Sequence, residues 1–345
     1  MWHNVFGTSC AHEGFFLKYT GVRMMRNKKM IWIISIFIVF VLVIYIAFIK
    51  KDILKEETLG AGSSDNYKKN ISIDKGSERK RDEYDSNSDL GLRIDEVLGD
   101  YKDNVAIYYY NLNTNEKYTL NENKEFIAAS TTKVATAMDI ADQVQSGIFS
   151  MDTLVDYTEE DYEEGSGVLY LQDEIEPLPI SKIIELSITE SDNIAKNMLR
   201  RISKIKTDDY IEKVTGEKVT PGNITTAQQQ FEILYRLYTN PDGNEYYDDI
   251  IEHMKNTIYD DRIAKYVPYE NVAHKIGEYY RYYHDIGIVY DENPYILVVL
   301  TKDIGELSDT SYEGDGEADD KYLVDWGESA IELIEEISRV VYENQ

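Results

Sequence analysis

Three short segments of the chain carry side chains that could do chemistry together. Ser130 and Lys133 lie one helical turn apart in the stretch FIAASTTKVATAMDIADQV, which begins at Phe126. A hydroxyl and an amine at this spacing face the same way on a helix, and they offer a nucleophile and a group that accepts its proton. The same tetrad is more often a helix-capping serine followed by a lysine that faces solvent. The pair therefore needs support from the rest of the chain.

The other two segments follow in the order that such chemistry requires. Ser191, Asp192 and Asn193 form an S-D-N tripeptide, and Lys275 to Gly277 read K-I-G. Each is weak alone, because S-D-N is a common capping sequence and K-x-G is frequent by chance. The predicted secondary structure around each segment strengthens the interpretation that they act together. The first segment opens a predicted helix, the second lies between two predicted helices, and the third lies on a predicted strand.

The elements that position these segments follow from hydrophobic periodicity. Helical spacing of apolar residues predicts a helix from Leu90 onward, one from Lys133 that ends at Gly147, and a mainly helical region over 180–240. A final amphipathic helix is predicted through Ile331 to Val341. Strand patterns are predicted in the ranges 105–120 (with a hairpin turn at 113–116), 272–280, 283–290 and 295–302.

The order of these elements predicts an α+β fold. A helix and a hairpin open the domain, a helical block fills its middle, and strands with a helix close it. We expect one antiparallel sheet flanked by the N- and C-terminal helices, together with a separate all-helical lobe. A cleft between two such parts is a usual place for a site.

Charge and cysteine content exclude several classes of function. The formal net charge of −28 repels nucleic-acid phosphates, so no nucleic-acid partner is expected. Acidic runs such as 159–164 and 315–320 are interpreted as solvated surface. The single cysteine, Cys10, precedes the predicted domain, which therefore has no disulfide framework and no cysteine nucleophile or metal ligand.

A membrane anchor is predicted near the N-terminus. The range 30–49 reads MIWIISIFIVFVLVIYIAFI, which contains no charge and is long enough to cross a hydrocarbon core of about 30 Å. Basic residues crowd its N-terminal side, which favours a cytoplasmic N-terminus and an exported C-terminal part. No small-residue cleavage site follows, so we expect an uncleaved, single-pass anchor in the cell membrane.

The predicted organisation therefore has four parts. They are a cytoplasmic segment 1–29, the transmembrane anchor 30–49, a polar disordered linker 50–89 and an extracytoplasmic folded domain 90–345. Met24 and Met25 directly precede the basic flank and are a normal start for such an anchor. We expect residues 1–23 to have no structural role.

The ordered set S-x-x-K, S-D-N and K-x-G is similar to the signature of penicillin-recognising serine enzymes. On these motifs, 90–342 resembles the class A β-lactamase family and, more distantly, the penicillin-binding proteins. The hairpin that leads into Ser130, GSGVLY at 165–170 and NITTAQQQFEILYRLY from Asn223 are similar to family segments in the same order.

The resemblance implies a serine hydrolase that opens β-lactam rings through an ester on Ser130. Lys133 would take the hydroxyl proton, which requires a neutral amine and hence a pKa about 3 units below its usual value, worth roughly 4 kcal/mol. Ser191 would relay a proton to the leaving nitrogen, and Lys275 would attract the substrate carboxylate. No cofactor and no metal are implied.

Substrate-binding roles also follow from the resemblance. Asn193 would hold the substrate amide. The backbone N–H groups of Ser130 and of Glu278, which follows Gly277, would form the oxyanion hole. The small-molecule partner would be a β-lactam, with antibiotic resistance as the consequence, or a peptidoglycan stem peptide.

Two departures from the family pattern bear on function. Ile276 stands where the family has a threonine or serine whose hydroxyl binds the substrate carboxylate. The loop that carries the deacylating glutamate is largely deleted between Asn197 and Thr225, where Glu212 and Glu217 are the nearby candidates. Asn197, which helps orient that glutamate in the family, is left as a remnant or as an ordinary helix residue. Acylation machinery is thus predicted, with slow deacylation.

Two alternative functions stay open. One is a D-Ala-D-Ala peptidase that acts on peptidoglycan, and the other is a non-catalytic sensor of cell wall or β-lactams, which Ile276 favours. His284 and Asp285 resemble a metal-binding pair but are interpreted as a strand surface pair. The acidic run 313–320 is interpreted as a solvated turn rather than a calcium loop, and His274 as structural.

Overall fold

The computed structural model describes residues 89–306 and 320–345. The chain divides into two compact units, 1–80 and 81–345, and all described residues belong to the second. The predicted anchor 30–49, the predicted segment 1–29 and nearly all of the predicted linker lie outside the described residues. Most of the acidic run 313–320 also lies outside them. No helix within 89–306 or 320–345 is long and apolar enough to cross a membrane.

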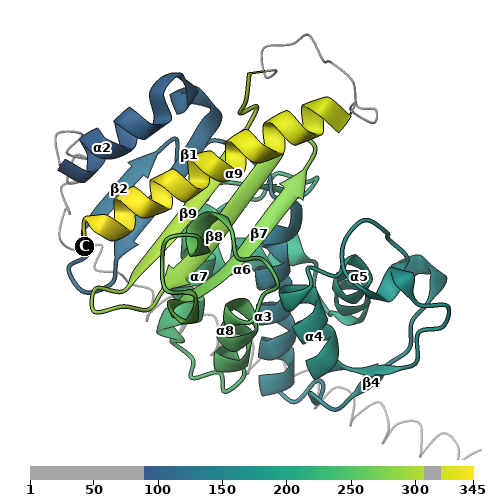
Figure 1. The fold of residues 1–345 in the computed structure, drawn as a ribbon. Helices are drawn as coiled ribbons and strands as arrows, with labels where there is room; N and C mark the ends of the chain where they lie inside the picture. The colour runs from purple at the N-terminus through teal and green to yellow at the C-terminus, as the bar shows by residue number, and fades with distance from the viewer. Residues whose placement is uncertain (1–88, 307–319) are drawn as a thin grey trace, which may run out of the picture. The chain divides into compact units, whose positions relative to one another are not determined.

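A five-stranded antiparallel sheet forms the centre of the described structure, as predicted. The strand order is β2-β1-β9-β8-β7 (Figure 1). The strands are β1 (Val105–Asn111), β2 (Lys117–Leu120), β7 (Val272–Tyr279), β8 (Tyr282–Val289) and β9 (Tyr295–Lys302). β7, at one edge, carries the K-I-G segment.

The N- and C-terminal helices cover one face of this sheet. They are α2 (Asp89–Leu98) and α9 (Asp320–Glu343), which lie across the sheet in Figure 1. Their apolar sides meet it through fully buried residues such as Ile94 and Ile334. The helical spacing read from the sequence therefore marked the faces that pack on the sheet.

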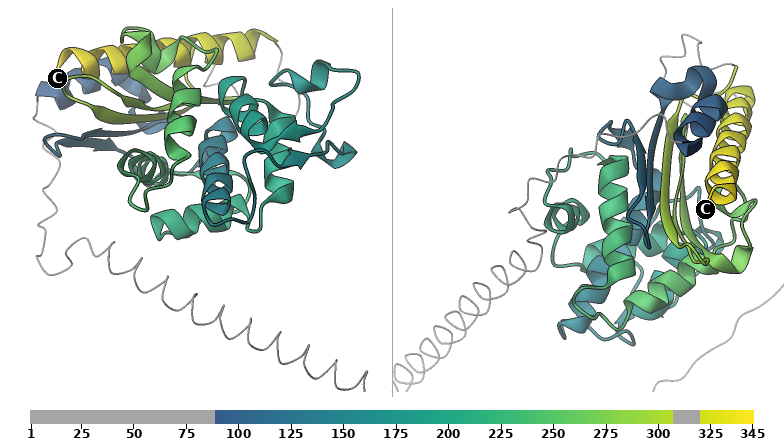
Figure 2. Two further views of the ribbon diagram at one scale, coloured as in Figure 1. Left: turned by 90° about the horizontal axis from the view of Figure 1, so that it is seen from below. Right: turned by 90° about the vertical axis from the view of Figure 1, so that its left-hand side faces the viewer.

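A block of helices covers the other face, as the two views of Figure 2 show. The block contains α3 (Thr132–Gln145), α4 (Ile180–Thr189), α5 (Asn193–Ile202), α6 (Thr207–Thr215), α7 (Ala227–Thr239) and α8 (Tyr247–Lys255). Nearly every residue of α3 is buried, including Lys133 and Asp139. Because α3 is enclosed on all sides, polar side chains on it must find partners inside the protein.

The strands between the two layers are apolar on both faces. In β9, Ile296, Val298 and Leu300 belong to the core with the helical block, whereas Leu297 and Val299 belong to the core with α2 and α9. This alternation follows from the two-residue period of a strand. It explains why the sequence shows a continuous apolar run here instead of an alternating one.

Short elements complete the framework. The short strands are β3 (Phe126–Ile127) with β6 (Ile224–Thr225), and β4 (Leu154–Val155) with β5 (Leu178–Pro179). The 3-10 turns are η1 (Gly99–Asn104), η2 (Ala129–Thr131), η3 (Glu159–Asp161), η4 (Leu169–Leu171), η5 (Arg262–Ala264) and η6 (Tyr269–Asn271). β3 and η2 matter most, because β3 leads into η2 and η2 contains Ser130.

The surface interpretation of His284 and Asp285 is wrong. Both side chains are fully buried, because β8 lies inside the sheet with layers on both faces. His284 Nδ1 accepts a hydrogen bond from the Thr301 N–H at 3.0 Å, so its Nε2 carries the proton and donates to the Ile127 carbonyl at 2.7 Å. Asp285 Oδ2 accepts from the Ile263 N–H at 3.1 Å. Both residues fix the framework.

Candidate active site

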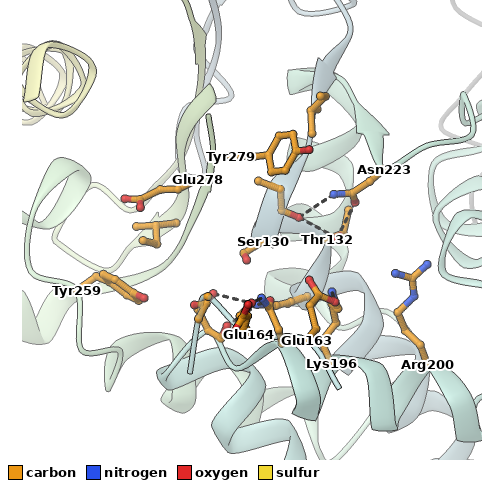
Figure 3. Close-up of a pocket in the computed structure, with 18 of the residues that line it drawn as sticks. Ser130, Thr132, Glu163, Glu164, Lys196, Arg200, Asn223, Tyr259, Glu278 and Tyr279 are labelled. Atoms are coloured by element: carbon orange, nitrogen blue, oxygen red, sulfur yellow. Dashed lines mark hydrogen bonds and ion pairs between the residues drawn. The ribbon is translucent and has the colours of Figure 1, made fainter. Parts of the chain in front are cut away.

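Ser130 lies in a tight turn between β3 and α3. Ala129, directly before it, has a φ of +50°, a left-handed conformation that costs a non-glycine residue about 1 kcal/mol or more. The turn is held from outside, because the Ala128 N–H donates to the Asn223 carbonyl at 2.7 Å and His284 holds the carbonyl of Ile127. This strained turn presents the Ser130 side chain to a cavity, as Figure 3 shows.

Lys133 is enclosed beneath Ser130 and is only 1% exposed. Its Nζ donates to the Ser191 backbone carbonyl and to Asn193 Oδ1 (2.8 Å), and it lies 3.1 Å from Ser191 Oγ. Burial lowers the pKa of Lys133 well below its usual value, and the charge of nearby Lys275 lowers it further. The structure thus favours the neutral amine that a proton acceptor requires.

Lys275 lies on β7, on the other side of Ser191. It has no exposed surface, and its Nζ donates to Ser191 Oγ at 2.9 Å and to the Ile276 carbonyl at 3.1 Å. Burial lowers the pKa of Lys275 to about 7, although the negative charge of Asp285 opposes this. Lys275 itself is fully buried and does not line the cavity.

These contacts indicate which group donates and which group accepts in each hydrogen bond. The Ser191 carbonyl and Asn193 Oδ1 can only accept hydrogen bonds, so the two N–H groups of a neutral Lys133 satisfy both. The lone pair of Lys133 is then left for the hydroxyl of Ser191, whose Oγ lies 3.1 Å away. Lys275 donates to Ser191 Oγ, which leaves the Ser191 proton free to point at Lys133. A continuous path joins Lys275, Ser191 and Lys133.

The S-D-N segment also fixes the wall opposite β7. Ser191 has a φ of +53°, and Asp192 caps α5 by accepting from the Ala195 N–H at 2.9 Å. The other carboxylate oxygen of Asp192 accepts from the N–H groups of Val168 and Leu169, at 2.7 and 2.8 Å. The capping interpretation of this tripeptide is therefore correct for Asp192, whereas Ser191 and Asn193 face the cavity.

The backbone of β7 lies against the Ser130 turn. A Cβ added to Gly277 would lie 2.9 Å from the Ala128 carbonyl oxygen and 3.3 Å from the Ser130 nitrogen. Only glycine allows this approach. It brings the backbone of Glu278 close to the backbone of Ser130. The N–H groups of these two residues could then both donate to one developing oxyanion.

A cavity of about 610 Å³ joins these parts. Ser130, Lys133, Ser191 and Asn193 line it, whereas Lys275 lies behind them. Residues from several separate segments form its walls: Ile127, Thr132, Glu163, Glu164, Ser166, Lys196, Arg200, Asn223, Tyr259, Ile276, Glu278 and Tyr279.

The carboxylates of the cavity differ from those expected. The surface interpretation of 159–164 is confirmed for Glu163 and Glu164, which are exposed and also line the cavity, and is wrong for Asp161, which is 1% exposed and pairs with Arg201. Glu212 instead pairs with Lys218, and neither it nor Glu217 is a lining residue, so both candidates are wrong. No local pattern indicated Glu163, because the fold of the segment before α4 brings it to the cavity.

Glu163 is held in place by α5. Its Oε2 accepts from Lys196 Nζ and from Asn197 Nδ2, both at 2.9 Å. These hydrogen bonds, and the positive charges of Lys196 and Lys133, lower the pKa of Glu163 despite its partial burial. Asn197 therefore still orients a glutamate, although a different one from that of the family loop.

A second charged group missed in the sequence lies near Ile276. Arg262, from η5, is fully buried and donates to Glu278 and, at 3.0 Å, to Asp261 Oδ1. Glu278 lines the cavity beside Ile276. The sequence signal was weak, because Arg262 directly follows two aspartates in DDRIAKY and such a charged run is usually exposed.

Within the described part of the chain, no three histidine, cysteine, aspartate or glutamate side chains are grouped so that they could hold a metal ion.

Comparisons with known proteins agree with the sequence motifs. A sequence model described as the beta-lactamase enzyme family matches residues 89–345. No curated protein matches the chain. Among solved structures, PBP-A is similar with a TM-score of 0.62 and 18% identity, over 74% of this chain and 96% of that one.

Two further structures show the same likeness. A class A beta-lactamase from Mycobacterium abscessus has a TM-score of 0.60 and 18% identity, over 74% of this chain and 98% of its own. A PBP-A mutant, described as an acyl-enzyme complex with penicillin G, has a TM-score of 0.61 and 18% identity, over 74% and 95%. At this identity the structural likeness shows the α+β fold with its antiparallel sheet and helices.

Proposed function

Because the chain belongs to the β-lactamase enzyme family, we propose that it is a serine hydrolase that opens β-lactam rings through an ester on Ser130. The observation that carries this proposal is the path from Lys275 through Ser191 to Lys133, set beside Ser130 at one cavity. A capping serine with a solvent-facing lysine would not produce a buried, deprotonation-prone amine.

Acylation would use these groups in sequence. Ser130 Oγ attacks the carbonyl carbon of the ring and forms the C–O bond, while its proton passes to neutral Lys133. The C–N bond then breaks, and the nitrogen takes a proton from Ser191, which is resupplied by the Lys133 ammonium. Lys133 returns to its neutral state, and the product is an ester on Ser130.

The negative charge that develops on the carbonyl oxygen would be stabilised by two backbone N–H groups. Those of Ser130 and Glu278 are proposed, because Gly277 brings the two backbones together. Loss of one such donor typically slows acyl transfer by about 100- to 1,000-fold. Asn193, between Lys133 and the Glu164 carbonyl, is placed to hold the substrate amide.

Release of the acyl group is proposed to be slow. The carboxylate among the lining residues that Asn197 holds is Glu163, and its ion pair with Lys196 stabilises the ionised form and weakens it as a base. The ester on Ser130 would therefore be hydrolysed more slowly than it forms.

We further propose that the domain acts on the outer face of the cell membrane, tethered by 30–49. The support is the uncharged length of that segment and the basic residues before it. Protease treatment of intact cells tests it, since digestion of the domain is expected outside the cell and protection would contradict this location.

The ester on Ser130 can be detected directly. The protein is incubated with a fluorescent penicillin, and its intact mass is followed over time. One adduct per chain is expected in the wild type and in Ser146→Ala, a change at the far end of α3, and none in Ser130→Ala. No adduct in the wild type, or an adduct that persists in Ser130→Ala, would overturn the proposal.

The same material separates the two alternatives. Release of D-Ala from a stem peptide at a rate above that of β-lactam opening would favour a D-Ala-D-Ala peptidase. A thermal shift with muropeptides or penicillin, without any covalent adduct, would favour a non-catalytic sensor.

A further inference from the structure

We propose that Glu278 supplies the anion on the Ile276 side of the cavity, so that Ser130 reacts fastest with acyl donors that carry no carboxylate beside the scissile bond. The inference rests on the proposed function, because it requires an ester on Ser130. It names a substrate class for that reaction: β-lactams and related amides or esters that are uncharged on this side.

The first observation is that Arg262, the cation that contacts Glu278, is already paired. Arg262 is fully buried, and its guanidinium donates to two carboxylates, those of Glu278 and Asp261. The side chain of Glu278 is 46% exposed, and it lines the cavity. One positive and two negative charges leave a net negative group where an incoming carboxylate would need a positive one.

The second observation is that Lys275 is not presented to the substrate. It has no exposed surface, does not line the cavity, and uses its Nζ for Ser191 Oγ and the Ile276 carbonyl. Burial also lowers its pKa to about 7, so it carries only part of a positive charge near neutral pH. The role expected for Lys275, attraction of the substrate carboxylate, therefore lacks support in this geometry.

The third observation concerns the surface that remains. Ile276 offers hydrocarbon instead of a hydroxyl, and two tyrosines, Tyr259 and Tyr279, line the cavity with it. Figure 3 shows Tyr259 on the same side of the cavity as Glu278, whereas the Tyr279 ring points the other way, toward Asn223. Aromatic and aliphatic surfaces pack well against uncharged groups, but they offer neither a hydrogen bond nor a positive charge to a carboxylate that has lost its hydrating water.

A substrate carboxylate could in principle replace Glu278 on Arg262. The structure opposes this, because Arg262 is fully covered and only the Glu278 end of the pair is exposed. The exchange would release the carboxylate of Glu278 into solvent and bury the carboxylate of the substrate in its place. Removing the charge of Glu278 is therefore the change that should open the site to carboxylates.

The test compares two donors that differ in one group: benzylpenicillin and its methyl ester. Rate constants of ester formation on Ser130 are measured by intact mass, and each is divided by the rate at which hydroxide opens the same ring in solution. This division removes any difference in ring reactivity. The wild type is expected to prefer the methyl ester by about tenfold or more, equivalent to about 1.4 kcal/mol.

Variants assign the preference to Glu278. Glu278→Gln is expected to shift the ratio of the two normalised rates toward benzylpenicillin by about tenfold, and Ile276→Thr, which adds a hydroxyl, to shift it in the same direction. Glu164→Gln removes the same charge from the opposite wall and is the matched control, with a shift of less than about threefold. Because each value is a ratio within one variant, partial loss of folding does not alter it.

Each outcome decides the matter. A wild-type preference for benzylpenicillin, or equal normalised rates, overturns the inference while leaving Ser130 chemistry intact. An equal shift in Glu278→Gln and Glu164→Gln also overturns it, because the effect would then be general. An ester with neither donor instead overturns the proposed function itself. If Glu278→Gln does not fold, Ile276→Thr provides the same comparison, and no shift there counts against the inference.

Discussion

Replacement of Lys275 by methionine is expected to remove acylation and yet to stabilise the folded protein near neutral pH. The unfolded chain holds a proton on Lys275 up to pH 10.5, whereas the folded protein releases it at about 7. Each pH unit between these values is worth about 1.4 kcal/mol, so burial of this amine opposes folding by roughly 4–5 kcal/mol at pH 7 and below.

The net change is smaller than this figure. Methionine has a similar length and no charge, but it loses the hydrogen bonds to Ser191 Oγ and the Ile276 carbonyl. Each loss costs about 1 kcal/mol. Lys275→Met should therefore be more stable than the wild type by about 2–3 kcal/mol at pH 6.5.

The sign of the pH dependence is fixed by the direction of the pKa change. Between about pH 7 and 10.5 the unfolded state binds more protons at Lys275 than the folded state, so wild-type stability rises with pH. The variant lacks this contribution. Its advantage should shrink by about 1.4 kcal/mol per pH unit and disappear near pH 9.

Urea unfolding at several pH values between about 6.5 and 9.5 provides the measurement, with Lys117→Met, an exposed position on β2, as the control. The control curve should run parallel to that of the wild type. Parallel curves for Lys275→Met as well would refute the reasoning, because Lys275 would then keep its proton in the folded protein.

Three further outcomes are expected. Ester formation should accelerate as pH rises through an ionisation well below 10.5, because only neutral Lys133 accepts the proton; a rate that begins to rise only near pH 10.5 would contradict this. Gly277→Ala should slow acylation by about 100-fold, measured by stopped-flow fluorescence, because its Cβ would push β7 away from the Ala128 carbonyl 2.9 Å away; an unchanged rate would exclude the proposed oxyanion site. Glu163→Gln should change the lifetime of the ester by less than about threefold in mass-detected chase experiments, because the carboxylate is held by Lys196; a tenfold longer lifetime would instead identify Glu163 as the deacylating base.

The sequence predicted the fold well where local pattern and burial agree. Helical spacing located α2, α3 and α9, and apolar runs located β7, β8 and β9. The pair β3 and β6 was not predicted, because two-residue strands depend on a partner far along the chain and have no period of their own.

The candidate site was only partly predictable, for a related reason. The types and spacing of Ser130, Lys133 and the S-D-N segment identify residues that the structure brings to one cavity. Their protonation depends on burial by residues remote in sequence, which no local pattern gives. The same applies to Glu163 and to the Arg262–Glu278 pair, because only the fold brings Glu163 to the cavity and buries Arg262 beside Glu278.

A structure of the protein after reaction with a β-lactam tests the central claim most directly. We predict an ester on Ser130 Oγ, with its carbonyl oxygen about 2.7–3.1 Å from the backbone nitrogens of both Ser130 and Glu278. The side chains of Lys133 and Ser191 should lie beside the nitrogen of the opened ring. An adduct on any other side chain, or a Ser130 ester whose carbonyl oxygen points away from Glu278, would contradict the account.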